Sequence, residues 1–210
     1  MILRLKNRTS AAALGVAALL LSSPVHASLS LSLLPAPDIL SGFIDVSYDS
    51  TTDLFDATGF ALELNDGIGD PKAIFEGAFD INALIDEFGV LGGGTIAVDG
   101  VVPSLGFVSG TLLTGILTDF GFPPSGDPLE FVFSVTGGDA AGLFGHGPIG
   151  VILSGSGFDG DFTSSFDNRI DQFPGAAFSD VAPVVPLPGS IWLALAGVGV
   201  SSIFRPRTKA

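Results

Sequence analysis

Short segments with strand-like alternation recur about every ten residues through the middle of this chain. In residues 43–49, Ile44, Val46 and Tyr48 alternate with the residues between them, and this period of two is typical of a strand with two different faces. Turn signals rich in glycine, proline and aspartate separate the segments. The spacing predicts an all-β antiparallel sandwich or barrel-like domain, with further strands at 60–64, 73–79, 95–101, 111–119, 129–136 and 150–153.

One stretch has the spacing of a helix. In residues 80–88, Ile81, Leu84, Ile85 and Phe88 recur at helical intervals, and Asp80 is a suitable N-cap. We therefore expect at most one short helix in the domain. Residues 28–37 are apolar and serine-rich with two prolines, and they are expected to form a lead-in or an edge strand.

The composition limits the kinds of site the domain can hold. The chain has no cysteine, which excludes disulfides and thiolate zinc sites. Residues 28–188 carry two basic residues and all 22 acidic ones, a balance of −20. Such a charge repels phosphate backbones, so we expect no nucleic-acid partner.

The N-terminus has the features of a secretory signal peptide. Three basic residues precede an apolar run at 11–21, and Val25 and Ala27 supply the small residues that signal peptidase accepts. We predict cleavage after Ala27. The alternative is an uncleaved anchor, but a helix of this run spans about 16 Å, against the roughly 30 Å of a bilayer core.

The C-terminus has three consecutive parts. A proline-containing motif comes first and is followed by an apolar segment, with a predicted transmembrane helix at 190–204, and by a basic end. The prolines hold the chain extended and accessible to a processing enzyme, and the basic end is expected to stay in the cytoplasm. The residues concerned are Val185, Pro186, Leu187 and Pro188 in the motif, Ile191, Trp192 and Leu193 at the start of the anchor, and Arg205, Arg207 and Lys209 in the basic stop.

This tail resembles the PEP-CTERM sorting signal, in a Val-Pro-Leu-Pro variant followed by Ile-Trp-Leu. The resemblance implies recognition by an exosortase-like membrane protease and transient anchoring in the inner membrane of a Gram-negative bacterium. The alternative is an ordinary C-terminal anchor. The middle domain also loosely resembles the glycine-rich β domains that often precede this tail, which mostly have no established biochemical role. The expected organisation is a signal peptide at 1–27, an acidic β domain at 28–184 and a sorting signal at 185–210.

Catalytic motifs are scarce in the mature region. His146 is its single histidine, within Gly145-His146-Gly147-Pro148, and no Gly-x-Ser-x-Gly motif accompanies it. We therefore predict no catalytic residues and interpret His146 as a loop residue.

A metal site and a glycoside-hydrolysing site are the remaining kinds of functional site that the domain could hold. One histidine without cysteine cannot build a transition-metal site, whereas calcium needs only oxygen ligands. We expect no cofactor, but two acidic clusters are candidates for a calcium site. The first cluster is Asp49, Asp53 and Asp56, and the second is Asp159, Asp161, Asp167 and Asp171. A pair of carboxylates could also hydrolyse a glycoside.

These features predict a non-enzymatic protein exported to the envelope or extracellular matrix, with a structural or adhesive role. Its expected partners are signal peptidase, the exosortase-like protease, the membrane and, as a further candidate, an exopolysaccharide. The alternatives are a secreted polysaccharide-acting enzyme and a calcium-stabilised binding module. A filled interior favours the first prediction, whereas two facing carboxylates in a cleft favour the enzyme.

Overall fold

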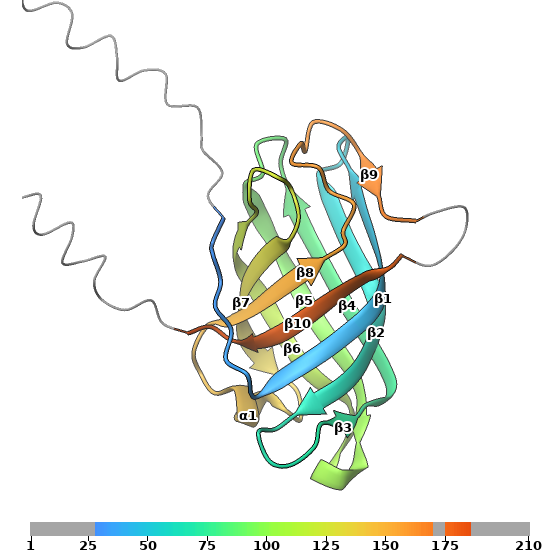
Figure 1. The fold of residues 1–210 in the computed structure, drawn as a ribbon, viewed down its shortest axis with the longest axis vertical. Helices are drawn as coiled ribbons and strands as arrows, with labels where there is room; N and C mark the ends of the chain where they lie inside the picture. Colours follow the sequence, from blue (N-terminus) through green and yellow to red (C-terminus); the bar gives the residue numbers. More distant parts are fainter. Residues whose placement is uncertain (1–27, 170–174, 186–210) are drawn as a thin grey trace, which may run out of the picture.

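The computed structural model describes residues 28–169 and 175–185. Within these residues, eight antiparallel strands close into a barrel (Figure 1). The barrel strands are β1 (Asp38–Asp49), β2 (Leu54–Asn65), β4 (Phe75–Ile85), β5 (Leu91–Val102), β6 (Phe107–Gly121), β7 (Leu129–Gly137), β8 (Ile149–Ser154) and β10 (Ala177–Pro183). The all-β prediction with a single short α-helix is confirmed for this part of the chain: α1 covers Ala141–Phe144, and a 3-10 turn, η2, covers Pro103–Leu105.

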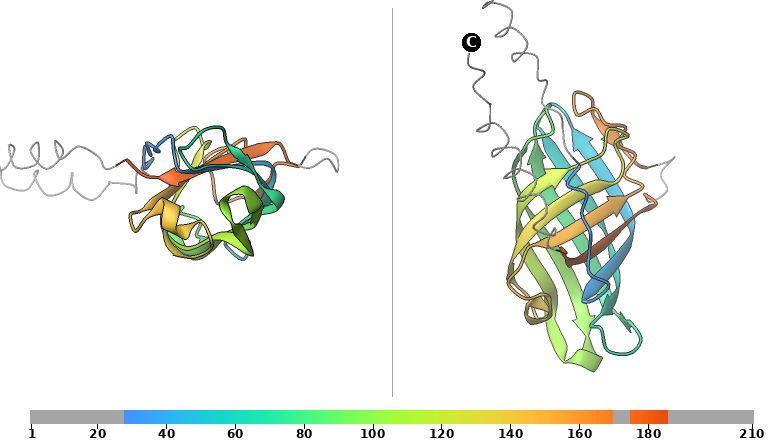
Figure 2. Two further views of the ribbon diagram at one scale, coloured as in Figure 1. Left: turned by 90° about the horizontal axis from the view of Figure 1, so that it is seen from below. Right: turned by 60° about the vertical axis from the view of Figure 1, so that its left-hand side comes forward.

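The barrel is a meander that closes on itself. Each barrel strand pairs with the next along the chain, and β10 pairs with β1 to complete the ring. Two short strands add to it, β3 (Lys72–Ala73) beside β2 and β9 (Phe166–Asp167) beside β1. Viewed from below, the strands form a closed ring (Figure 2, left). Among residues 28–169 and 175–185, closure leaves no long unpaired strand edge that another chain could extend.

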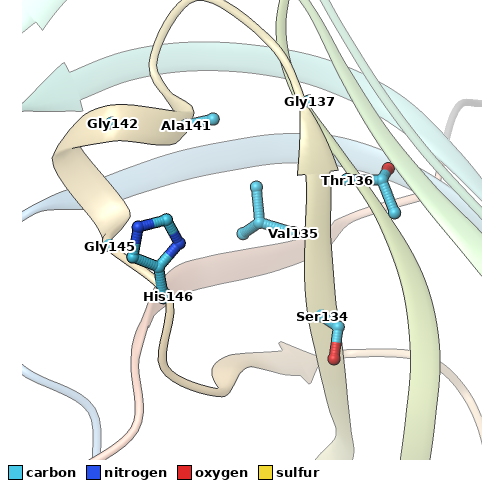
Figure 3. A pocket seen from close by; sticks show the side chains of 8 residues that line it. All are labelled: Ser134, Val135, Thr136, Gly137, Ala141, Gly142, Gly145 and His146. Carbon is cyan, nitrogen blue, oxygen red and sulfur yellow. The ribbon is translucent and has the colours of Figure 1, made fainter.

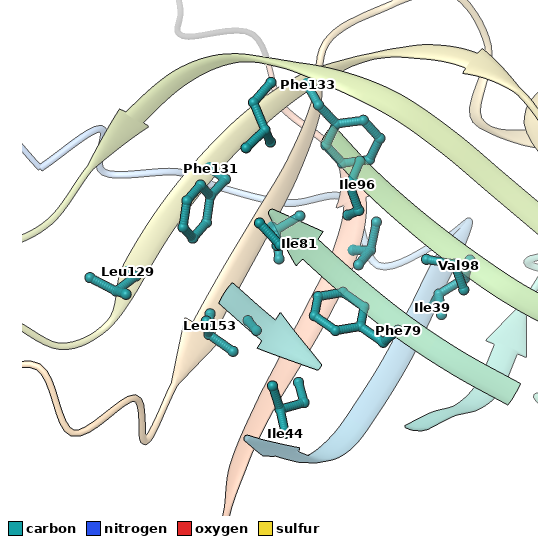
Figure 4. Packing of buried hydrophobic residues seen from close by; sticks show 14 of the residues in the cluster. Ile39, Ile44, Phe79, Ile81, Ile96, Val98, Leu129, Phe131, Phe133 and Leu153 are labelled. Atoms are coloured by element: carbon teal, nitrogen blue, oxygen red, sulfur yellow. The ribbon is translucent and has the colours of Figure 1, made fainter. Parts of the chain in front are cut away.

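Apolar side chains fill the barrel interior. Alternate residues of each strand point inward, as the period-two pattern predicts, and the largest of them are fully buried (Figure 4). An eight-stranded barrel is just wide enough for its side chains to fill it. The residues labelled there are Ile39, Ile44, Phe79, Ile81, Ile96, Val98, Leu129, Phe131, Phe133 and Leu153.

One glycine makes this packing possible. Gly115 in β6 faces Phe133 in β7, and a Cβ atom at position 115 would lie 2.3 Å from Cδ2 of the Phe133 ring. Any larger residue would have to displace that ring, because protein interiors have almost no spare volume. Gly115 therefore sets where the large Phe133 side chain can sit.

Aromatic rings close one end of the barrel. The loop between β8 and β9 crosses this end, and its Phe162 contacts every other ring of the group. The nearest is Phe158, with ring centroids 4.2 Å apart, and Phe162 itself is 2% exposed. We call the group the aromatic plug; its members are Tyr48, Phe120, Phe122, Phe158, Phe162 and Phe166.

The predicted helix at 80–88 is wrong. Residues up to Ile85 belong to β4, where Ile81, Ala83 and Ile85 point inward and Leu84 lies on the outer surface, 50% exposed. The helical spacing of Ile81, Leu84 and Ile85 arose because both faces of this strand carry apolar residues. Pairing with β2 and β5 decides the conformation, and the short helix lies instead at 141–144.

The two predicted terminal helices lie outside the described residues. Within the part of the chain that the structure describes, no helix is both long enough and apolar enough to cross a membrane.

Candidate functional site

The first described residues run over the outside of the barrel. This lead-in segment, residues 28–37, crosses the outer faces of β7, β8 and β10 before the chain enters β1 (Figure 2, right). It lies as an added layer on the outside of the barrel and is not a ninth strand of the wall. The segment begins at the residue that follows the predicted signal cleavage site.

Glu130 of β7 holds the start of the lead-in segment. Its Oε2 accepts hydrogen bonds from the backbone N–H of Ser30 at 2.9 Å and from the hydroxyl of Ser28 at 3.0 Å. Its Oε1 accepts a third from the N–H of Leu31 at 3.0 Å. Glu130 is on the outer face of the barrel, yet it is only 5% exposed because the segment covers it. A covered carboxylate of this kind needs such donors to offset its lost hydration.

The C-terminal junction lies beside the same segment. The N–H of Leu34 donates to the carbonyl of Pro183 at 2.9 Å, and Leu33 and Val184 form an antiparallel bridge. The N–H of Val185 then donates to the carbonyl of Ser32 at 2.7 Å. The lead-in segment and the last described residues therefore leave the barrel side by side.

A hollow of about 420 Å³ opens at this junction. Its walls are mostly apolar, and Asp119 of β6 supplies one carboxylate. The lining comprises Leu29, Ser30, Leu31, Ser32, Asp119, Val132, Pro148, Val184 and Val185.

The predicted sorting motif begins at this place. Val185 is its one described residue, and its N–H is bonded to the Ser32 carbonyl of the lead-in segment. The other predicted sorting, anchoring and processing positions lie outside the described residues: Ala27, Pro186, Leu187, Pro188, Ile191, Trp192, Leu193, Arg205, Arg207 and Lys209. Their roles stay predictions.

A second hollow, of about 300 Å³, contains His146 (Figure 3). Figure 3 shows His146 after α1, on the side of β7 to which Val135 points, whereas the Ser134 and Thr136 side chains point away from it. The Thr136 hydroxyl pairs with that of Thr114 at 3.0 Å. No Asp or Glu is among the residues that line this hollow, so a Ser-His-Asp arrangement is not assembled there.

An apolar groove of about 620 Å³ lies on the outer face of β1, β2 and β4. Phe43 and Phe60 on its walls are 64% and 57% exposed, and Phe75 nearby is 59% exposed. Phe43 has a φ of +53°, which is rare for a bulky residue, at an irregularity in the pairing of β1. This irregularity turns the ring outward, and exposed apolar patches of this kind are frequently contact surfaces.

Two carboxylates come together on neighbouring strands. Burial raises the pKa of Asp38 in β1 and of Asp180 in β10, and Asp38 raises that of Asp180 further. One oxygen of each is buried without a hydrogen-bond partner. Neither residue lines the junction hollow, the His146 hollow or the apolar groove. They form a carboxylate pair in the barrel wall, outside these three hollows.

The acidic clusters considered for calcium do not converge. Hydrogen bonds from Thr51 lower the pKa of Asp49, and those from Thr163 lower the pKa of Asp161, as in ordinary turns. Asp53 accepts a long contact from the hydroxyl of Tyr48, at 3.5 Å. Between residues 28 and 169 and from 175 to 185, no three His, Cys, Asp or Glu side chains gather closely enough to hold a metal ion.

The remaining acidic candidates are spread over the surface. Burial raises the pKa of Asp56, with Asp80 adding to the effect and Arg169 opposing it. Asp159 and Asp167 are exposed, and Asp171 lies outside the described residues.

Glu130 is the functional candidate that the sequence analysis missed. The available signal was a single acidic residue inside the apolar run Leu129-Glu130-Phe131-Val132-Phe133. A charge on the outer face of a strand is ordinary, and the segment that covers it is about 100 positions away in sequence. No protein-family model, curated protein or solved structure gives a significant match to this chain.

Proposed function

We propose that this chain is an exported protein that an exosortase-like system sorts to the cell envelope or extracellular matrix, where its acidic barrel has a structural or adhesive role. Signal peptidase would remove residues 1–27. The C-terminal helix would hold the chain in the inner membrane of a Gram-negative bacterium until the protease acts near Pro188.

The observation that best supports this proposal is the position of the two predicted processing junctions. Ser32, four residues after Ser28, and Val185, the last described residue, are joined by a backbone hydrogen bond, so the described residues next to the two predicted junctions lie close together. A chain attached to a membrane at this place would present the rest of the barrel to its surroundings. The Val185 N–H is bonded, whereas Pro186 and Pro188 have no N–H to pair, which favours an extended segment just beyond the folded body.

The filled interior supports a surface role for the barrel. The largest inward side chains are fully buried, and the aromatic plug covers one end. The exposed groove beside Phe43 and Phe60 is a candidate adhesive surface, and the acidic surface keeps copies apart in solution.

A secreted polysaccharide-acting enzyme is the second candidate, favoured by the Asp38 and Asp180 pair. Two close carboxyl groups with raised pKa values resemble the acid and base that a glycosidase needs. The pair lines none of the three hollows described above, which is why we favour the non-enzymatic role.

The proposal is tested by changing both prolines of the sorting motif in the native host. Wild-type protein should leave the inner membrane, whereas the double variant Pro186→Ala, Pro188→Ala should accumulate there at full tail length. Pro206→Ala, a proline change in the basic end, serves as the control and should fractionate as wild type. An inner-membrane fraction that is the same for the double variant and the wild type would contradict the proposal.

A further inference from the structure

Glu130 is a nearly buried carboxylate whose donors are all neutral. They are two backbone N–H groups and one hydroxyl, and the ion pairs found in the described residues, Arg169 with Asp45 and Lys72 with Asp66, do not include it. A buried charge without a countercharge is costly. All three donors belong to the first four residues after the predicted signal cleavage site.

Cleavage after Ala27 would place a positive charge next to this carboxylate. The hydroxyl of Ser28 is 3.0 Å from Oε2 of Glu130. The backbone nitrogen of a serine is three bonds from its own hydroxyl oxygen, so it lies within about 7 Å of the carboxylate. In the uncleaved chain this nitrogen is a neutral amide; after cleavage it is an α-ammonium group.

The other charged groups around this position are also acidic. Asp119 of β6 lines the hollow that Leu29 and Ser30 border, β8 carries no charged residue, and the charged residue of β10 is Asp180. The lead-in segment has no charged side chain. Nothing positive on these elements competes with the new N-terminus for Glu130.

We propose that Glu130 is the binding site for the α-ammonium group that signal peptidase creates on Ser28. This inference rests on the proposed function, because it requires export and cleavage after Ala27. Processing would then convert a covered, unpaired carboxylate into a salt bridge that fastens the lead-in segment to the barrel. Since Ser32 holds Val185, the same step would also fix the C-terminal junction.

The α-amine can be followed on its own because the processed chain has few amines. The full chain is produced with its signal peptide in a Gram-negative host, and an intact mass identifies the first residue of the purified protein. Reductive methylation with ¹³C-formaldehyde then labels the α-amine, Lys72 and, where the tail is retained, Lys209. NMR then follows the chemical shift of each methylated amine against pH in the wild type and in Glu130→Gln. The control is Glu87→Gln, which makes the same change of charge at an exposed position.

We expect the α-amine of the folded wild type to titrate at least about half a unit above the usual value of about 7.7. Glu130→Gln should bring it back toward that value, and Glu87→Gln should leave it raised. Because the folded pKa is the higher one, the bridge stabilises the fold below pH about 7.7, and this contribution is lost as the pH rises through the folded pKa.

Two results would overturn the inference and are distinguishable from each other. A first residue other than Ser28 would contradict the predicted cleavage and the inference together. A chain that begins at Ser28 but whose α-amine has the same pKa in the folded protein and in urea would contradict the inference. It would leave the predicted cleavage intact. This second comparison uses only wild-type protein, so it decides the matter even where Glu130→Gln fails to fold.

Discussion

The hydroxyl of Tyr48 donates a 2.9 Å hydrogen bond to the backbone carbonyl of Ile85, joining β1 to the end of β4 past the intervening β2. Tyr48 is 3% exposed and also packs against Phe162 and Phe166 of the aromatic plug. The single tyrosine of the chain thus connects the wall of the barrel to its closed end.

Removing this hydroxyl should destabilise the fold. Tyr48→Phe keeps the ring but leaves the buried Ile85 carbonyl without its partner, and we expect a loss of about 1–3 kcal/mol. Urea unfolding of the two proteins measures it. Ser164→Ala, which removes an exposed hydroxyl, is the control and should change the free energy of unfolding by less than about 0.5 kcal/mol. Equal stability of Tyr48→Phe and wild type would show that the bond contributes nothing.

The same residue should ionise only at high pH. Burial, followed by the negative charge of Asp53, raises the pKa of Tyr48 from 10.0 to about 12. Because the folded pKa is the higher one, this contribution to stability is full below pH 10 and is lost as the pH rises toward about 12. The ultraviolet phenolate band measures Tyr48 alone, and a midpoint near 10 in folded protein would contradict the prediction.

The aromatic plug should be a major source of stability. Phe162→Ala removes a ring that contacts five others, and we expect it to cost about 3–5 kcal/mol. Phe60→Ala, the matched change at a ring that is 57% exposed, should stay within about 0.5 kcal/mol of wild type. Similar losses for the two variants would mean that the plug is no more important than the surface.

The carboxylates of Asp38 and Asp180 should destabilise the barrel at neutral pH. Burial first, and then the neighbouring charge of Asp38, raises the folded pKa of Asp180 above 3.8, so stability is lost as the pH rises through that folded value. Asp180→Asn should therefore raise the melting temperature at pH 7, by an amount that shrinks toward pH 4.

The control for this prediction is Asp161→Asn. Hydrogen bonds from Thr163 lower the pKa of Asp161, so its stabilising contribution is present above the unfolded pKa and is lost as the pH falls. This variant should gain nothing at pH 7. A gain for Asp180→Asn that persists unchanged at pH 4 would show that charge is not the cause.

The strands of this fold were predictable, but closure of the barrel was not. Period-two alternation and glycine turns are local signals, and they located the segments that became β1, β5, β6 and β7. Closure depends on β10 pairing with β1, and β10 is a short stretch that ends in Pro183, with no signal strong enough to predict a strand. In this fold, the long-range pairing of β10 with β1 is what closes the meander into a barrel.

The junction was predictable only in part. The two processing positions are predicted from local composition and from the order of the segments along the chain, and they stay predictions because they border residues outside the described part of the chain. That Ser32 would lie beside Val185, or that Glu130 would accept bonds from Ser28 and Ser30, depends on contacts between distant residues. No pattern within one segment of the sequence carries that information.

The most direct test of the proposed function is the intact mass of the protein recovered from membrane and released fractions of its native host. We predict a released chain that begins at Ser28 and has lost everything after about Pro188. A protein that retains its basic end through Lys209 and stays in the membrane fraction would contradict sorting by an exosortase-like protease and indicate a permanent anchor.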